Sequence, residues 1–253
     1  MSDTLPLPTR RDEAWRYSDI DALAPVWPDI AGTREDIVVA AGESANRQLV
    51  LAPGEPNVAV ETLVIRLEKD ARFALHCLAI DADYGRIAVE VTLAEGAHFE
   101  LGGAILGTGD QTLEIVTDVR HVERGGTSNQ VVRSVLGETA TGSFLGKVAV
   151  ARDAQKIDAS QSVKAMLLDR TATANAKPEL EIFADDVKCA HGATVGELDK
   201  QALFYLASRG LPPAEARKLM LQAFIADAFV SLDDEAAHDA IEAKALAVLE
   251  AIT

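Results

Sequence analysis

Short segments in which apolar and polar residues alternate follow one another from about residue 58 to residue 184. In one of them Ile87, Val89, Val91 and Leu93 share one face, with smaller or polar residues between them. The same alternation occurs at residues 113–119, 144–150 and 157–167. A spacing of two is typical of strands with one buried face, and no convincing helical periodicity interrupts it. The segments therefore predict a large all-β region.

Turn-forming stretches such as "DADYG", "LAEGA" and "ERGGTSN" separate these segments. A sandwich and a solenoidal β-helix both fit many short strands, and the frequent Ala, Gly, Ser and Thr suit tightly stacked coils. There is no strict short repeat, so composition leaves the choice open. The glycine-rich stretch "LGGAILGTGDQT" lacks the Lys-Ser/Thr pair of a P-loop and the third glycine of a dinucleotide-binding loop. We interpret its glycines as tight turns of the β region.

Helical patterns replace the alternation after residue 196. In "ELDKQALFYLASRG" we predict Asp199 as the N-cap and the closing glycine as the C-cap. A second helix is expected to begin near Pro213 and to run to Val230, with apolar residues on more than one side. Asp233 or Asp234 is expected to cap a last, amphipathic helix.

The first residues contain "RRDEAWRYSDIDAL", which we interpret as a short helix or turn anchored by Trp15 and Tyr17 and closed off by Pro25 and Pro28. The chain thus divides into a short N-terminal segment, a β core and a C-terminal helical subdomain, at residues 1–36, 37–196 and 197–253.

Charge and cysteine content narrow the functional classes. The 40 acidic and 24 basic residues give a formal net charge of −16, which disfavours nucleic acids and anionic membrane surfaces as partners. No apolar run approaches the roughly 18 residues that cross a bilayer, and the start does not resemble a signal peptide. The two cysteines, Cys77 and Cys189, form no disulfide-type pattern. We therefore expect a cytoplasmic protein.

The sequence Cys189-Ala190-His191 is the strongest candidate for chemistry. On a strand, residues two apart project from the same face, and thiolate and imidazole both bind soft or borderline metal ions. A closed tetrahedral site needs four ligands, so the others would have to come from another subunit or from sulfide. The alternative is a structural role, with a half-buried cysteine beside a hydrogen-bonded histidine. The spacing alone favours this structural alternative. His76 and Cys77 are adjacent, so a strand would send them to opposite faces.

The stretch "KPELEIFADDVKCAHGATVGELDKQALFYLASRGLPPAEARKLMLQAF", residues 177–224, resembles the C-terminal signature of the SufB/SufD family, the scaffold subunits of the SUF iron–sulfur cluster assembly system. The preceding "SFLGKVAVARDAQKIDASQSVKAMLLDRTATANAKP" is similar to that family's core, and "RRDEAWRYSDIDAL" to its N-terminal motif. Glycine follows His191 where SufB-like chains have glutamate, so the resemblance is to SufD rather than SufB. It implies a mainly β fold, a right-handed parallel β-helix core with helical ends.

The resemblance also implies a function and partners. The chain would be a non-catalytic scaffold that pairs with a SufB-like subunit, forms a possible homodimer when isolated, and holds the SufC ATPase on its C-terminal helices. Cys189 and His191 match the residues at the SufB interface where a transient iron–sulfur cluster forms, with none bound stably by this chain alone. The residues expected to contact SufC are Pro213, Leu219, Met220, Phe224 and Phe229. Family members are commonly longer ahead of the core, so we expect no full N-terminal helical domain here.

Two other interpretations stay open at this stage. A SufD-like subunit could ligate nothing and only complete the fold of its partners. A stand-alone β-helix enzyme acting on carbohydrates would need carboxylates, arginines or a catalytic histidine clustered along one β face, and no such cluster is visible in the sequence.

Overall fold

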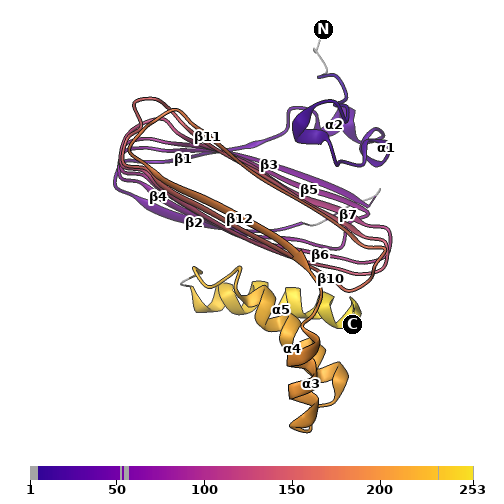
Figure 1. The fold of residues 1–253 in the computed structure, drawn as a ribbon. Helices are drawn as coiled ribbons and strands as arrows, with labels where there is room; N and C mark the ends of the chain where they lie inside the picture. Colours follow the sequence, from indigo (N-terminus) through magenta and orange to yellow (C-terminus); the bar gives the residue numbers. More distant parts are fainter. Residues whose placement is uncertain (1–4, 52, 54–56, 233, 253) are drawn as a thin grey trace.

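The structure is a computed structural model that describes residues 5–51, 53, 57–232 and 234–252. In these residues a long β body lies between a short N-terminal segment and a group of C-terminal helices (Figure 1). The elements are η1 (Glu13–Trp15), α1 (Ile20–Leu23), α2 (Trp27–Ile30), β1 (Glu35–Val39), β2 (Ser44–Val50), β3 (Val58–Leu67), β4 (Arg72–Ala79), β5 (Tyr84–Leu93), β6 (His98–Gly107), β7 (Thr112–His121), β8 (Thr127–Leu136), β9 (Thr141–Val150), β10 (Asp158–Leu167), β11 (Thr173–Ile182), β12 (Lys188–Gly196), α3 (Lys200–Ser208), α4 (Pro213–Ala226) and α5 (Glu235–Ile252).

Successive strands alternate between two parallel sheets. One sheet has the order β1-β3-β5-β7-β9-β11 and the other β12-β10-β8-β6-β4-β2, which we call the odd sheet and the even sheet. Each odd strand and the even strand after it therefore make one coil, and every coil stacks on the one before it. This arrangement is a parallel β-solenoid, so the predicted β-helix is confirmed and the sandwich is excluded.

The coils differ in length, which explains why the sequence shows no strict repeat. Val58 pairs with Tyr84, 26 residues further on, whereas Thr141 pairs with Thr173, 32 residues further on. The strands stay in register because the extra residues are accommodated in the turns between them.

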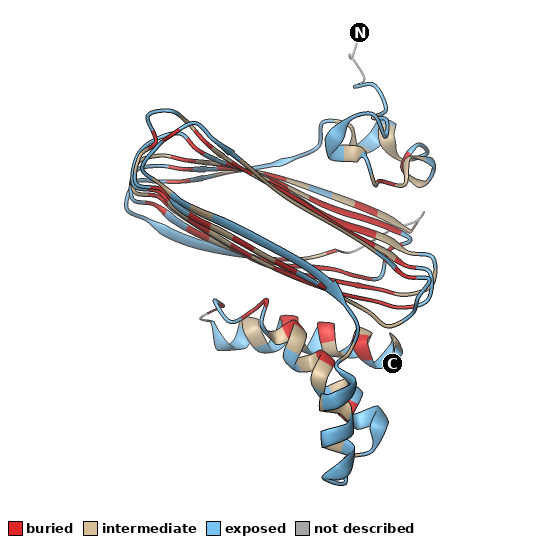
Figure 2. Ribbon diagram, in the orientation of Figure 1, coloured by how far each residue is buried: buried red, intermediate tan, exposed pale blue. Residues whose placement is uncertain are grey.

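The inner faces of the two sheets form the main hydrophobic core. Ile87, Val89 and Val91 are buried there, as the alternation predicted. Figure 2 shows buried positions interspersed with intermediate and a few exposed ones along many of the strands. Cys77 belongs to this core, whereas the neighbouring His76 lies on the outer face, with its Nε2 3.0 Å from Ser231 Oγ. The adjacent pair thus points in opposite directions, as expected.

The N-terminal segment packs on the outer face of the odd sheet (Figure 1). Trp15 stacks on Arg86 of β5, so its predicted role as an anchor is confirmed, and Tyr17 is half-buried. Pro28 was expected to close the segment, but it is the second residue of α2 and begins a helical turn instead. Proline is well suited to the first turn of a helix because that turn does not need its N–H.

A second hydrophobic core lies between the outer face of the even sheet and the C-terminal helices. Leu78, Leu106 and Val135 come from the sheet, and Leu221 and Leu249 from α4 and α5. Among the described helices, none is both long enough and apolar enough to span a membrane.

The first C-terminal helix has the predicted ends. Asp199 is the N-cap of α3, and its Oδ1 accepts hydrogen bonds from the backbone N–H groups of Gln201 and Ala202. Gly210 follows the helix with a φ of 89°, a conformation that glycine adopts without strain.

The other two helices differ from the prediction in one respect. Pro213 begins α4 as expected, but the helix ends at Ala226 rather than Val230. Asp234 accepts a hydrogen bond from the backbone of Ala237 at the start of α5, while Asp233 lies outside the described residues.

An ion pair holds the end of α4 against the even sheet. Nε and Nη2 of Arg133 on β8 both donate to Asp227, over 2.8 and 2.6 Å. The chain turns immediately after this residue, so that Ala228 and Phe229 pack into the second core instead of continuing the helix.

The interpretation of the glycine-rich stretch as turns was wrong for its first three glycines, since Gly107 is the last residue of β6 and only Gly109 lies in a turn. Gly102 and Gly103 lie within β6. A Cβ on Gly102 would be 2.0 Å from the carbonyl oxygen of Ala228, and one on Gly103 would be 3.0 Å from Ile115. Gly102 thus permits close packing of the C-terminal helical subdomain on the even sheet.

Candidate functional site

The solenoid ends in an open coil made by β11 and β12. Each is the last strand of its sheet, β11 pairing with β9 and β12 with β10. Figure 2 shows β12 as largely exposed, and only Cys189 in it is half-buried. The far edges of both strands therefore carry backbone N–H and C=O groups without a strand partner in the described part of the chain.

Cys189 faces the interior of the solenoid at this open end. It pairs in register with Ala159 of β10 and packs against the main core. Burial raises the pKa of the Cys189 thiol above its ordinary value, and the negative charge of Asp158 adds to the effect, while a backbone hydrogen bond with Ala159 opposes it. The uncovered chain thus holds this sulfur mainly as the thiol.

His191 shares the face of Cys189, as the spacing predicted, because the two residues are two apart on one strand. It pairs in register with Gln161 and is exposed. The open coil therefore presents a sulfur and an imidazole together, above the core and toward the space beyond the last coil. Two donors alone do not close a metal site, so a metal ion held here would need further ligands.

Gln161 is a residue that the search for motifs passed over. It lies on the inner face of β10 between Ala159 and Val163, and it is 3% exposed. The sequence did contain a signal, because the alternation predicts an apolar side chain at this position and glutamine carries a carboxamide instead. Its position directly beside His191 became visible only with the register of the last two even strands.

The N-terminal segment touches the open coil. Lys177 of β11 pairs with Glu13, and its Nζ lies 3.1 Å from Glu179 Oε1. The bond to Lys177 lowers the pKa of Glu13, and the two carboxylates raise the pKa of Lys177, with Glu13 the larger cause. The N-terminal segment and the last strand of the odd sheet are therefore linked by charge at the surface.

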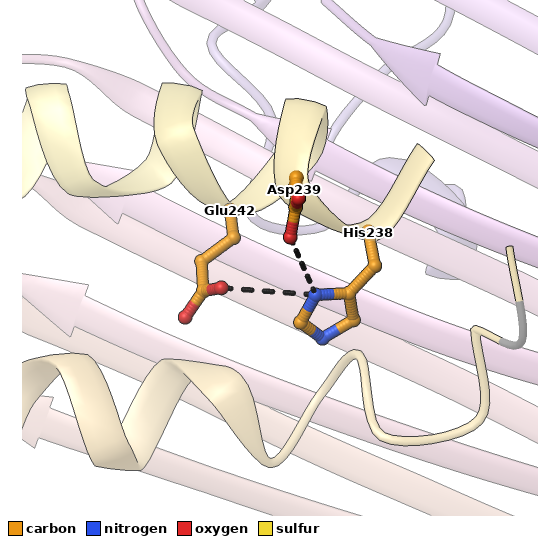
Figure 3. Close-up of side chains that lie close together, drawn as sticks. All are labelled: His238, Asp239 and Glu242. Carbon is orange, nitrogen blue, oxygen red and sulfur yellow. Dashed lines mark ion pairs between the residues drawn. The ribbon is translucent and has the colours of Figure 1, made fainter. Parts of the chain in front are cut away.

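A second group of potential metal donors lies on α5 and not at the open coil (Figure 3). His238 Nδ1 is 3.7 Å from Glu242 and 4.0 Å from Asp239, and both carboxylates point at this one nitrogen. These are ordinary neighbours on a helix, and Asp239 is exposed. We interpret the group as a helix ion pair.

The residues that were expected to contact an ATPase differ in how far they are exposed. Pro213 and Leu219 are exposed on α4, Leu219 by 50%, and Met220 and Phe224 are half-buried. Phe229 is fully buried in the second core. Its assignment as a contact residue is therefore corrected, because it packs the C-terminal helical subdomain onto the even sheet.

Two exposed aromatic residues on the neighbouring helix α3 were not identified as contact candidates from the sequence. Phe204 and Tyr205 of α3 are 75% and 56% exposed. In Figure 1, α3 projects away from the solenoid, with α4 beside it. Large exposed side chains on a projecting helix pair are typical of a contact surface. We call Phe204, Tyr205, Pro213, Leu219 and Met220 the hairpin surface.

Comparison with known proteins agrees with this architecture. The family described as "SUF system FeS cluster assembly, SufBD core domain" matches residues 35–224, which include the whole solenoid, α3 and most of α4.

Individual relatives match a smaller part. The chain is 34% identical to a SufBD family iron–sulfur cluster assembly protein of Synechocystis sp. over 166 residues, which cover 65% of this chain and 37% of that protein. It is 32% identical to the iron–sulfur cluster assembly protein SufD of Escherichia coli over 141 residues, 56% of this chain and 33% of the relative. The matched region thus spans about a third of these relatives. The family match nevertheless covers most of the chain, which therefore belongs to the SufBD core-domain family of the SUF iron–sulfur cluster assembly system.

Proposed function

We propose that this chain is a non-catalytic scaffold subunit of a SUF assembly complex, in which it pairs with a SufB-like subunit and binds a SufC ATPase. The observation that carries the proposal is the open coil. It combines unpaired strand edges with Cys189 and His191 on one face. A partner strand added to such an edge gains main-chain hydrogen bonds along its length.

The partner would complete the site as well as the sheet. Cys189 and His191 supply one thiolate and one imidazole, and the partner and inorganic sulfide would supply the other ligands of the nascent cluster. The cluster is cargo in this proposal, held while it is built and then passed on. The raised pKa of Cys189 fits transient binding, since the sulfur must lose its proton each time metal arrives.

The ATPase would bind the hairpin surface. This surface lies on the C-terminal helical subdomain, whose α4 and α5 are packed against the even sheet, so a force applied to it would be transmitted to the solenoid. Nucleotide-driven movement of the ATPase is then a means of opening or closing the contact at the open coil.

The test is anaerobic co-expression with SufB-like and SufC-like partners, followed by measurement of iron and sulfide in the purified complex. We expect Cys189→Ala and His191→Ala to lower both, with the subunits still co-purifying. Thr194→Ala is the matched control, because Thr194 lies on the outer face of the same strand and should load as wild type.

The rival interpretation is a purely structural subunit without ligands. It predicts intact complexes with wild-type iron and sulfide in both variants, and that result would remove the ligand role while leaving the pairing role in place.

A further inference from the structure

The carboxamide of Gln161 is buried without a hydrogen-bond partner. The side chain is 3% exposed, and neither its Nε2 nor its Oε1 has a partner among the described residues. Buried polar groups in folded proteins are nearly always paired, so an amide with both ends unpaired calls for an explanation. Its position one coil below the open end suggests where the missing partner is.

The opposite sheet offers space but no partner. Across the interior lies Gly146 of β9, where an added Cβ would be 2.6 Å from Gln161 Nε2. Pro178 pairs with Gly146 in the last coil, and its side chain has no hydrogen-bonding group. The odd sheet thus leaves room for the amide without bonding to it.

The neighbours in the even sheet are Gln130 on one side and His191 on the other. Gln130 is also fully buried; its Oε1 accepts a hydrogen bond of 2.7 Å from Thr117, and its Nε2 has no partner among the described residues and makes no bond to Gln161. His191 is the polar side chain on the open side of Gln161, and side chains in register on neighbouring parallel strands lie roughly 5 Å apart.

We propose that Gln161 is a positioning residue for His191, an inference that rests on the proposed ligand role of this histidine. His191 is exposed and does not bond to Gln161 in the structure, but rotation of its side chain toward the core would bring a ring N–H to Gln161 Oε1. That oxygen then accepts a hydrogen bond, which fixes one tautomer. The other ring nitrogen then keeps its lone pair and faces the open end. Metal-ligating histidines commonly donate their second nitrogen to a carbonyl or carboxylate in this way.

The contact can be tested in the isolated chain, without a cluster. Nitrogen-15 NMR of the imidazole ring distinguishes the two neutral tautomers, and the spectrum of His191→Ala identifies the signals of His191. We expect a single tautomer in the wild type and a mixture in Gln161→Met, which keeps the size of the side chain but removes its hydrogen bonds. Gln161→Glu should restore a single tautomer, because a carboxylate accepts the same bond.

Gln130→Met is the matched control. This residue has the same chemistry and burial one coil further from the open end, so the replacement should leave the tautomer of His191 unchanged. A His191 tautomer that is the same in wild type and in folded Gln161→Met would overturn the proposal.

Iron retention in the co-expressed complex separates this inference from the function on which it rests. Loss of a residue that orients a ligand typically lowers metal affinity about 10- to 100-fold, so Gln161→Met should lose iron more readily than Gln130→Met. If Gln161→Met changes the tautomer of His191 but not the retention of iron, the contact between the two residues is supported and the ligand role of His191 is rejected.

Discussion

The guanidinium carbon of Arg86 lies 3.8 Å from the centroid of the Trp15 ring. Beneath this contact Arg86 Nη1 is 3.0 Å from Glu114 Oε2, and Tyr84 donates to the other oxygen of the same carboxylate over 2.7 Å. Arg86 and Glu114 are both almost completely buried. The N-terminal segment is therefore attached to the odd sheet through a charge pair that it shields from water, and the tryptophan of the "DEAWRYSD" stretch has a structural role.

Glu114→Ala should strongly destabilise the fold, because it leaves the buried charge of Arg86 without its partner. We expect a loss of about 3–5 kcal/mol in the free energy of unfolding. The two tryptophans, Trp15 and Trp27, both lie in the N-terminal segment, so their fluorescence reports its release while circular dichroism reports the sheets. Glu90→Ala, at an exposed site on β5, should change the unfolding free energy by less than about 0.5 kcal/mol. Equal effects of the two variants would contradict the role of the buried pair.

Cluster retention should fall in mild acid. In the proposed ligand role metal would bind the thiolate of Cys189, and the raised pKa of this thiol means that protons would compete with metal more effectively as the pH decreases. Iron and sulfide measured in the purified complex should therefore decline as the pH is lowered from about 8 to about 5. Occupancy that is constant over this range would argue against Cys189 as a ligand.

His121 should make the fold sensitive to acid. It lies inside the solenoid with Nε2 2.9 Å from Ser128 Oγ, and burial lowers its pKa from 6.5 to about 4. Below pH 6.5 the unfolded chain takes up a proton that the folded chain does not, so this contribution to stability is complete above pH 6.5 and is lost as the pH falls toward 4. The loss amounts to about 2.5 kcal/mol near pH 4.5.

Urea denaturation at pH 7 and pH 4.5 checks this expectation. The decrease in unfolding free energy between the two pH values should be smaller in His121→Gln than in wild type. Thr194→Ala, at an exposed position of β12, changes no titratable group and should keep the wild-type decrease. An unchanged decrease in His121→Gln would assign the acid sensitivity to other groups.

Much of the fold was predictable from local chemistry, and the remainder depended on contacts distant in sequence. The alternation at Ile87, Val89 and Val91 and the cap at Asp199 follow from burial and hydrogen bonding within one element. Gly102 has the same local signature as a turn glycine, but it serves a contact with Ala228 that lies more than a hundred residues away. The same holds for the site. Two residues on one strand could be predicted to share a face, while the position of Gln161 beside His191 required the register of two strands.

Gly102→Ala should loosen the C-terminal helical subdomain. The added methyl group would meet the backbone carbonyl of Ala228 at 2.0 Å, and a backbone atom cannot move aside as a flexible side chain can. We expect a loss of about 1–3 kcal/mol in the free energy of unfolding, with earlier proteolysis of the helices than of the solenoid. Gly192→Ala is the control, since a methyl group there meets nothing within 4 Å. Equal stabilities of the two variants would show that the helices can shift to accommodate the methyl group.

Leu219 and Phe229 lie ten residues apart, and a charge at either should remove the ATPase, but only the charge at Phe229 should disrupt the fold. Leu219 is half-exposed on the hairpin surface, so Leu219→Asp should abolish co-purification of the ATPase and leave the melting temperature close to that of wild type. Phe229 is fully buried between the helices and the even sheet, so Phe229→Asp places an unpaired carboxylate in an apolar core. That variant should lose the ATPase only because the C-terminal helical subdomain comes away, which limited proteolysis would detect. Retained ATPase binding in a folded Leu219→Asp protein would place the docking site outside the hairpin surface.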